Sequence, residues 1–209
     1  MAEGWPAVLR EGDVVLRPMR LRDGKAWLAV RSRNAAWLEP WEATSPTPVL
    51  GPAPTMRQFV RRLSAQARAG LALPFVIVYR GELVGQLTVS SIQRGSAESA
   101  SIGYWVSEHV AGRGIVPMAV ALAVDHCFGP VGLHRVEIAI RPENAASLRV
   151  VAKLGLREEG TRLRFLHIRG DWRDHRCFAV TPEEVPGGLV ARLLATTTGR
   201  HAAAPAPGD

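Results

Sequence analysis

The chain has 209 residues, of which 47% are hydrophobic and 22% are charged, and its formal net charge is +7. This composition is typical of one globular domain with its own hydrophobic core. No apolar run reaches the ~18 residues of a membrane span, and residues 1–30 lack the apolar core of a secretion signal, which argues against a membrane or secreted protein and favours the cytoplasm.

The first third of the chain predicts one strand followed by two helices. Pro18 in the strand indicates an edge position, because proline has no N–H for a second neighbouring strand. Asp23 and Thr55 are expected to cap the two helices. Four prolines exclude regular structure between the helices, and loops of this length are often functional lids. The predicted elements are a strand over 13–20, a helix over 23–37, a long loop over 44–54 and a helix over 55–69.

The rest of the chain predicts strands and helices in a mixed order, separated by glycine and proline. The predicted strands cover 74–79, 83–92, 100–106, 134–141, 156–159 and 173–181, with a loop over 160–172. The predicted helices cover 115–128, 145–154 and 189–194, and 199–209 are expected to form a disordered tail. We expect one domain over residues 1–181 and a largely flexible C-terminal extension over 182–209.

Cysteine usage and charge give further expectations. Cys127 and Cys177 form no metal-ligand spacing, so we expect two reduced, buried thiols and no metal site. The positive charge comes mostly from arginine. It fits an acidic partner, a phosphorylated ligand, the ribosome surface or simply a high-GC genome.

At the centre of the chain, a strand leads through a loop with Gly112 and Gly114 into an almost wholly apolar helix. Glycines let the backbone approach a ligand closely, so that successive N–H groups and the helix dipole can hold an anion. A pyrophosphate is the natural ligand of such a loop. Taken alone the pattern is weak, because two glycines between a strand and a helix often form only a tight turn.

Several short motifs follow one another between Val14 and Val180. They are the run over 15–23, Leu38-Glu39-Pro40-Trp41, Ile102-Gly103-Tyr104-Trp105, His109-Val110-Ala111-Gly112-Arg113-Gly114, Asn144-Ala145-Ala146-Ser147 and Lys153-Leu154-Gly155-Leu156. In these motifs the chain resembles the GNAT superfamily of acyl-CoA N-acyltransferases. Within it, the chain is similar to the RimJ/RimL-like acetyltransferases of ribosomal-protein N-termini that begin with alanine or serine. One departure is His109, because the loop of the family normally begins with arginine or glutamine.

The resemblance implies an α/β fold and acetyl-CoA as the cosubstrate. The fold would be a single GNAT-type domain, with a mixed, mostly antiparallel central sheet that is splayed open in the middle and flanked by about four helices. Pantetheine would lie in the splay, between the strand of Tyr104 and the strand over 134–141, and the acetyl carbonyl would bind backbone N–H groups near Val106. The residues implied in binding acetyl-CoA are Trp105, Val106, His109, Val110, Ala111, Gly112, Arg113, Gly114, Ile115, Asn144 and Ser147.

Asn144 and Ser147 stand in the first turn of a predicted helix, where a purely structural cap is the default interpretation. The resemblance implies that Asn144 orders the pantetheine arm and that Ser147 protonates the departing thiolate. The amine would attack the thioester directly in a ternary complex, without an acyl-enzyme.

The general base cannot be transferred from the family, because Leu166 and Ser101 stand where relatives carry glutamate. Glu42, Glu98 and Glu137 are the candidates by proximity in the expected fold. An α-amine with a pKa of ~7.7–8.0 is partly neutral at cytoplasmic pH, whereas a lysine at ~10.4 is almost wholly charged. A distant base acting through water could therefore suffice for a protein N-terminus.

The acceptor is expected between segment 38–54 and loop 160–172. Trp41 would form an apolar wall there and Glu42 would hold the ammonium group, although Trp41 could equally pack only the end of the first helix. The leading prediction is an acyl-CoA-dependent N-acetyltransferase for protein N-termini, with a ribosomal protein as a candidate partner. The alternatives are a lysine or small-molecule acyltransferase, including one that uses succinyl-CoA, and a weakly catalytic module that binds the ribosome or acyl-CoA. The sequence leaves monomer and homodimer open.

Overall fold

The structure is a computed structural model that describes residues 4–47 and 51–202. Within these residues the strands are β1 (Leu9–Glu11), β2 (Val14–Pro18), β3 (Leu73–Tyr79), β4 (Glu82–Gln93), β5 (Ser99–Val106), β6 (Arg135–Ile140), β7 (Arg157–Ile168) and β8 (Asp171–Val180). The α-helices are α1 (Gly24–Arg33), α2 (Ala35–Leu38), α3 (Met56–Arg68), α4 (Ile115–Phe128), α5 (Ala145–Leu154) and α6 (Leu189–Ala202). No helix in the described ranges is long and apolar enough to cross a bilayer.

The described strands form one sheet in the order β1-β2-β3-β4-β5-β6-β8-β7. All neighbours are antiparallel except β5 and β6. These two pair only at their first residues, Ser99–Ser101 with Arg135–Glu137, although both strands continue further. They therefore separate toward their C-terminal ends. This confirms the predicted mixed, mostly antiparallel sheet that is splayed open in the middle.

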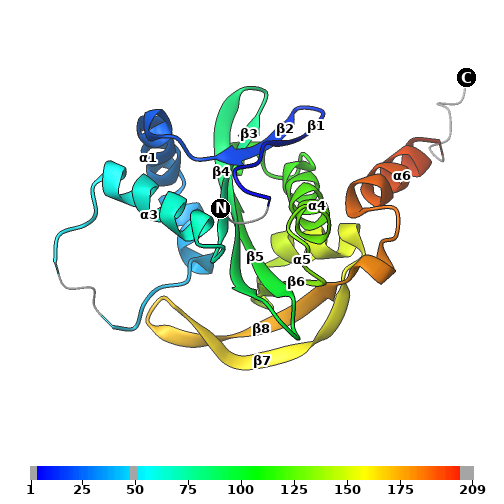
Figure 1. The fold of residues 1–209 in the computed structure, drawn as a ribbon. Helices are drawn as coiled ribbons and strands as arrows, with labels where there is room; N and C mark the ends of the chain where they lie inside the picture. The colour runs from blue at the N-terminus through cyan, green and yellow to red at the C-terminus, as the bar shows by residue number, and fades with distance from the viewer. Residues whose placement is uncertain (1–3, 48–50, 203–209) are drawn as a thin grey trace, which may run out of the picture.

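Helices cover both faces of the sheet, with α1 and α3 on one side and α4, α5 and α6 on the other (Figure 1). The described residues thus contain six α-helices where about four were predicted. Helix α3 begins as predicted: the Thr55 hydroxyl accepts the N–H of Gln58, and the Gln58 side chain accepts the N–H of Thr55.

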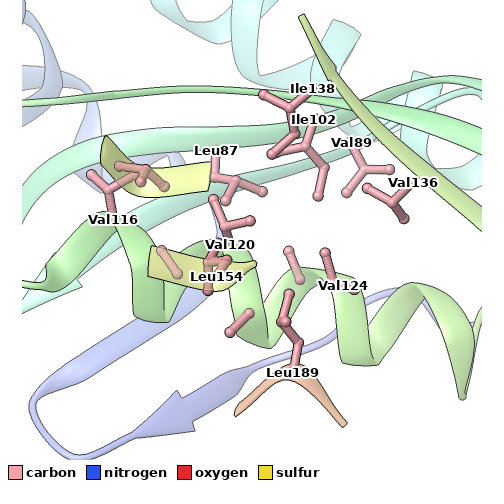
Figure 2. Packing of buried hydrophobic residues seen from close by; sticks show 14 of the residues in the cluster. Leu87, Val89, Ile102, Val116, Val120, Val124, Val136, Ile138, Leu154 and Leu189 are labelled. Atoms are coloured by element: carbon pink, nitrogen blue, oxygen red, sulfur yellow. The ribbon is translucent and has the colours of Figure 1, made fainter. Parts of the chain in front are cut away.

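Helix α4 is apolar on nearly all sides because the sheet and α6 enclose it. Figure 2 shows Val120 and Val124 of α4 close to side chains of the central strands, among them Leu87 and Ile102. From α6, Leu189 joins the same core and is fully buried. This packing fixes the start of α4, and therefore the loop before it, relative to the sheet.

Helix α6 differs from its prediction. It runs to Ala202, beyond the short helix predicted over 189–194, and it includes residues 199–202 of the predicted tail. The rest of that tail lies outside the described residues. Asp125 of α4 anchors the beginning of α6, because its carboxylate accepts the N–H groups of Leu189 at 2.6 Å and Val190 at 3.0 Å. The division of the chain at residue 181 stays a prediction.

The predicted edge position of Pro18 is wrong, because β2 lies between β1 and β3. Strand β1 reaches only as far as Leu16, so the missing N–H of Pro18 faces no neighbouring strand. The predicted cap is also wrong. The Asp23 carboxylate does not cap α1 but accepts the N–H of Arg20 at 2.7 Å and binds the Arg17 guanidinium at 2.6 and 2.9 Å.

The predicted loop over 160–172 is mostly strand. Strands β7 and β8 form a long hairpin that runs across the base of Figure 1, with its turn on the side of α1 and α3. The turn consists of Arg169 and Gly170, whose φ values of 52° and 80° suit a tight two-residue connection. The strand predicted over 156–159 continues in β7, where residues 160–164 are all exposed, so no alternation of apolar and polar residues marked this continuation as a strand.

Candidate active site

The loop between β5 and α4 has the backbone geometry of an anion site. Gly112 and Gly114 are left-handed, with φ values of 80° and 78°, and a Cβ added to either would meet nothing within 4 Å. Gly114 occupies the N-cap of α4, and no side chain satisfies the first N–H groups of the helix. These N–H groups at the positive end of the helix dipole are available to a phosphate.

A cleft of about 670 Å³, here called the central cleft, extends from this loop along the end of β5, where β5 has separated from β6, to α5. Most residues predicted to bind acetyl-CoA line it, namely Trp105, Val106, Val110, Ala111, Gly112, Gly114, Ile115, Asn144 and Ser147. The side chains of the other two, His109 and Arg113, do not line it. The His109 Nδ1 lies 2.8 Å from the Ser107 hydroxyl, so this ring stabilises the conformation of the loop.

Asn144 and Ser147 lie together in the wall of the central cleft at the start of α5. The Asn144 Oδ1 accepts the N–H of Ser147 at 3.0 Å, so the asparagine is a helix cap, as the sequence indicated. This bond uses the backbone of Ser147 and leaves its hydroxyl to face the cleft. The Ser147 side chain lowers the pKa of the Tyr104 phenol, against the effect of burial, and the sequence did not single out Tyr104 for the site.

The candidate carboxylates are dispersed. Glu42 lines the central cleft and forms an ion pair with Arg31. Glu98 lies outside the cleft, where hydrogen bonds from Arg94 and from the N–H of Gly95 lower its pKa. Glu137 also lies outside and binds Arg135 and Arg162 at 2.8 and 3.0 Å. The position and partners of Glu98 and Glu137 therefore give no support to their choice as general base.

Glu143 lines the cleft but was not among the sequence candidates. A hydrogen bond from its own backbone N–H is the main cause that lowers its pKa, and Arg141 adds to it. Such a carboxylate is a weak base, because it remains ionised at neutral pH without taking up a proton. Glu42 is thus the better placed of the two carboxylates in the wall.

The end of the cleft beside α1 is lined by aromatic and cationic side chains. The Arg31 guanidinium lies 5.8 Å from the Trp27 ring and 5.2 Å from the Trp105 ring. Trp41 is half-buried, lines the cleft and lies 5.5 Å below the guanidinium of Arg141. Trp27 was not among the residues predicted for the site. Its spacing of four residues from Arg31 was the available signal that both share one face.

The segment after Trp41 runs toward the β7–β8 hairpin. The N–H of Thr44 donates to the carbonyl of His167 at 2.8 Å, and the Thr44 hydroxyl lies 2.8 Å from the His167 Nδ1. The two segments predicted to flank the acceptor are therefore in contact. Residues 48–50 of the predicted loop lie outside the described residues.

These features define a class of protein. The splayed sheet and the glycine loop at a helix N-terminus accompany a sequence match to the acetyltransferase (GNAT) domain family over residues 13–157, and the chain belongs to this family. It is an acyl-CoA-dependent N-acetyltransferase. Among the described residues, no group of histidine, cysteine, aspartate and glutamate side chains could hold a metal ion.

The chain is similar to several named acetyltransferases. The structure of RimJ from Mycobacterium smegmatis in complex with CoA-disulfide is 42% identical, with a TM-score of 0.86 over 94% of this chain and 98% of that chain. The probable N-acetyltransferase YjcK of Bacillus subtilis is 28% identical over 83% of this chain and 96% of its own length. The [ribosomal protein uS5]-alanine N-acetyltransferase of Escherichia coli is 32% identical over 107 residues, which are 51% of this chain and 55% of that protein.

Proposed function

We propose that this protein transfers the acetyl group of acetyl-CoA to the α-amine of a protein N-terminus, with a ribosomal protein as the acceptor. The observation that carries the proposal is the central cleft, which links the glycine loop before α4 to Ser147 on α5 through the splay of the sheet. The CoA compound bound by M. smegmatis RimJ supports the donor, and the uS5-alanine activity of the E. coli relative supports the acceptor.

Each part of the cleft has a task in this reaction. Acetyl-CoA supplies a thioester whose carbonyl carbon an amine can attack. Backbone N–H groups at Gly114 and Ile115 would hold the pyrophosphate. Asn144 caps α5 with Oδ1 and keeps Nδ2 for the pantetheine arm. Ser147 would donate its hydroxyl proton to the sulfur as the C–S bond breaks.

Glu42 is the carboxylate proposed to bind the incoming amine. Its ion pair with Arg31 holds it at the wall of the cleft, and the second carboxylate oxygen can accept an ammonium group. An α-amine with a pKa of ~7.7–8.0 then loses its proton to water or to Glu42 at small cost, whereas a lysine at ~10.4 would need a stronger base. The absence of a better base in the described wall of the cleft therefore favours an N-terminal acceptor.

A second candidate is an acidic acyl donor such as succinyl-CoA. Arg31 in the wall of the cleft is the observation that favours it, because a guanidinium can bind a carboxylate. Its ion pair with Glu42 competes with that role. The choice of acyl group is therefore tested together with the acceptor.

Mass spectrometry of the products decides between these candidates. The wild-type protein is incubated with acetyl-CoA or succinyl-CoA and with a panel of alanine- and serine-initiated peptides, lysine peptides with blocked N-termini, and polyamines. We expect acetylation of the peptide N-termini to be fastest. Faster modification of a lysine side chain or a polyamine contradicts the acceptor, and preference for succinyl-CoA contradicts the donor.

A further inference from the structure

Tyr104 has a buried hydroxyl group that the reaction as described above does not use. The residue lies on β5 and lines the central cleft. Its hydroxyl oxygen is fully buried and forms no hydrogen bond of good geometry within the described residues. Buried polar atoms without a partner are uncommon in folded proteins and call for an explanation.

The surroundings of the phenol do not supply a structural reason for the hydroxyl. Tyr104 packs against the apolar core under α4, where phenylalanine would fill the same space without burying a polar atom. Burial raises the pKa of Tyr104 to about 12, and the Ser147 side chain opposes this rise. The phenol is therefore neutral at physiological pH and retains a proton to donate.

The Ser147 hydroxyl oxygen is the atom that can accept a hydrogen bond from this phenol. The backbone N–H of Ser147 is bound by Asn144, which fixes the start of α5 but leaves the hydroxyl free to rotate. A serine hydroxyl has one proton and two lone pairs, so its proton is directed only if another donor occupies a lone pair.

We propose that Tyr104 positions Ser147 by donating its O–H to the serine oxygen, so that the serine proton points at the sulfur of the thioester. The inference rests on the proposed role of Ser147 as the proton donor. Tyr104 touches the reacting atoms only through Ser147 and is a positioning residue.

The atoms and charges of the step balance without a further reactant. The nitrogen lone pair forms the C–N bond, the C–S bond breaks, and its electrons go to sulfur, which takes the proton of Ser147. The nitrogen gives up one proton to water, and Ser147 regains one from water. Tyr104 keeps its own proton throughout, so its contribution is direction of the serine proton and a stronger hydrogen bond along the chain.

The test compares Tyr104→Phe with Tyr79→Phe, because these are the two tyrosines of the chain and both lie in the sheet. Tyr79 is on β3, outside the wall of the cleft. We expect Tyr104→Phe to lower kcat about tenfold, the value of one neutral hydrogen bond, with KM for acetyl-CoA and the melting temperature retained. Tyr79→Phe should leave kcat within twofold of wild type.

The double variant Tyr104→Phe/Ser147→Ala tests whether Tyr104 acts through Ser147. If Tyr104 acts through Ser147, the double variant has the same kcat as Ser147→Ala alone, since there is no hydroxyl left to position. A kcat of Tyr104→Phe within twofold of wild type overturns the inference, and so does a loss in the double variant that is the product of the two single losses. Ser147→Ala measured alone shows separately whether the proposed proton donor fails.

Discussion

Asn34 joins the helical layer over one face of the sheet to the loop that leads into α4. Its Nδ2 donates to the Ser107 hydroxyl at 2.8 Å and to the carbonyl of Val30 at 2.8 Å, and its Oδ1 accepts the N–H of Glu108 at 2.9 Å. The side chain is 3% exposed, so these bonds are shielded from water. The residue also separates α1 from α2, where one continuous helix over 23–37 was predicted.

Replacing Asn34 by alanine should destabilise the protein and weaken its cosubstrate site. The change leaves the N–H of Glu108 without its acceptor and removes one of the two partners of the Ser107 hydroxyl, which costs about 1–3 kcal/mol in unfolding free energy. Urea unfolding measures this loss, and calorimetric titration with CoA should show weaker binding. Ser32→Ala, at an exposed position on the same helix, is the control. A midpoint of unfolding equal to that of wild type contradicts the prediction.

The sequence predicted those parts of the fold in which local signals agree. Thr55 marked the start of α3 as its expected cap, and Gly112 and Gly114 marked the loop between β5 and α4. Only the start of β7 was predicted, as part of the strand over 156–159; its continuation was predicted as a loop because residues 160–164 are exposed on both faces and show no apolar period. The strand depends on pairing with β8, which is a contact that local sequence does not encode.

The candidate site was predicted to a similar extent. The backbone parts of the site follow from the glycines before α4 and from the start of that helix, and both are local sequence signals. The grouping of side chains depends on which strand faces which helix: Tyr104 of β5 lines the central cleft together with Ser147 of α5, and the Arg31 guanidinium of α1 lies 5.2 Å from the Trp105 ring of β5. Glu137, a candidate by proximity in the expected fold, lies outside the central cleft. Register fixes that residue opposite Ser101, at the closed end of the splay.

A side chain at Gly114 should reduce both stability and CoA affinity. Its φ of 78° strains any residue with a Cβ, so Gly114→Glu should lose about 1–2 kcal/mol of unfolding free energy in addition to blocking the phosphates. Gly132→Glu is a matched control, because Gly132 has a φ of 70° and equally open space but lies outside the central cleft.

The two glycine variants should lose similar amounts of stability, whereas only Gly114→Glu should weaken CoA binding in a calorimetric titration. Equal CoA affinities in both would remove the glycine loop from the cosubstrate site.

Trp41→Ala should affect the acceptor more than the fold. Trp41 is half-buried beside Arg141 and lines the central cleft, so its loss should cost less than the ~3–5 kcal/mol of a fully buried aromatic. We expect KM for an alanine-initiated peptide to rise several-fold while CoA affinity is retained. Trp5→Ala is the contrast, because the ring centroids of Trp5 and Phe75 are 5.1 Å apart and Trp5 packs on the core away from the cleft. It should lower stability and leave KM unchanged; the opposite pattern would make Trp41 a packing residue.

Asp125→Ala should loosen α6 without changing catalysis. The carboxylate accepts the first N–H groups of α6 and favours the positive end of its dipole, so its loss should cost about 1–2 kcal/mol of unfolding free energy. Asp125→Asn keeps an acceptor oxygen and should lose less. Urea unfolding and steady-state kinetics check both variants. An unfolding free energy that stays at the wild-type value in Asp125→Ala would show that α6 does not depend on this cap.

The folded protein should lose stability at mildly acidic pH. Burial lowers the pKa of His126 and of His175, against opposing hydrogen bonds with the carbonyls of Gly4 and Arg173. In the unfolded chain both side chains return to a pKa of ~6.5. Near and below this pH the unfolded chain therefore binds more protons than the folded protein. Their contribution to stability is therefore complete above ~6.5 and is lost as the pH falls from there through the lower folded pKa values. We expect the melting temperature to fall by several degrees between about pH 7 and 5.5.

Carboxylates cannot account for a loss in this window. Arg135 and Arg157 lower the pKa of Glu159 to about 2, so its stabilising ionisation is lost only below its unfolded value of ~4.3. His126→Gln keeps a donor for the carbonyl of Gly4 and removes the titration, so it should flatten the profile of melting temperature against pH between 7 and 5.5. His134→Gln is the comparison at an exposed histidine: it removes the pair of His134 with Glu183 at 2.9 Å and measures what this pair contributes to the profile. A wild-type melting temperature that stays constant over this range would show that neither buried histidine resists protonation in the folded protein.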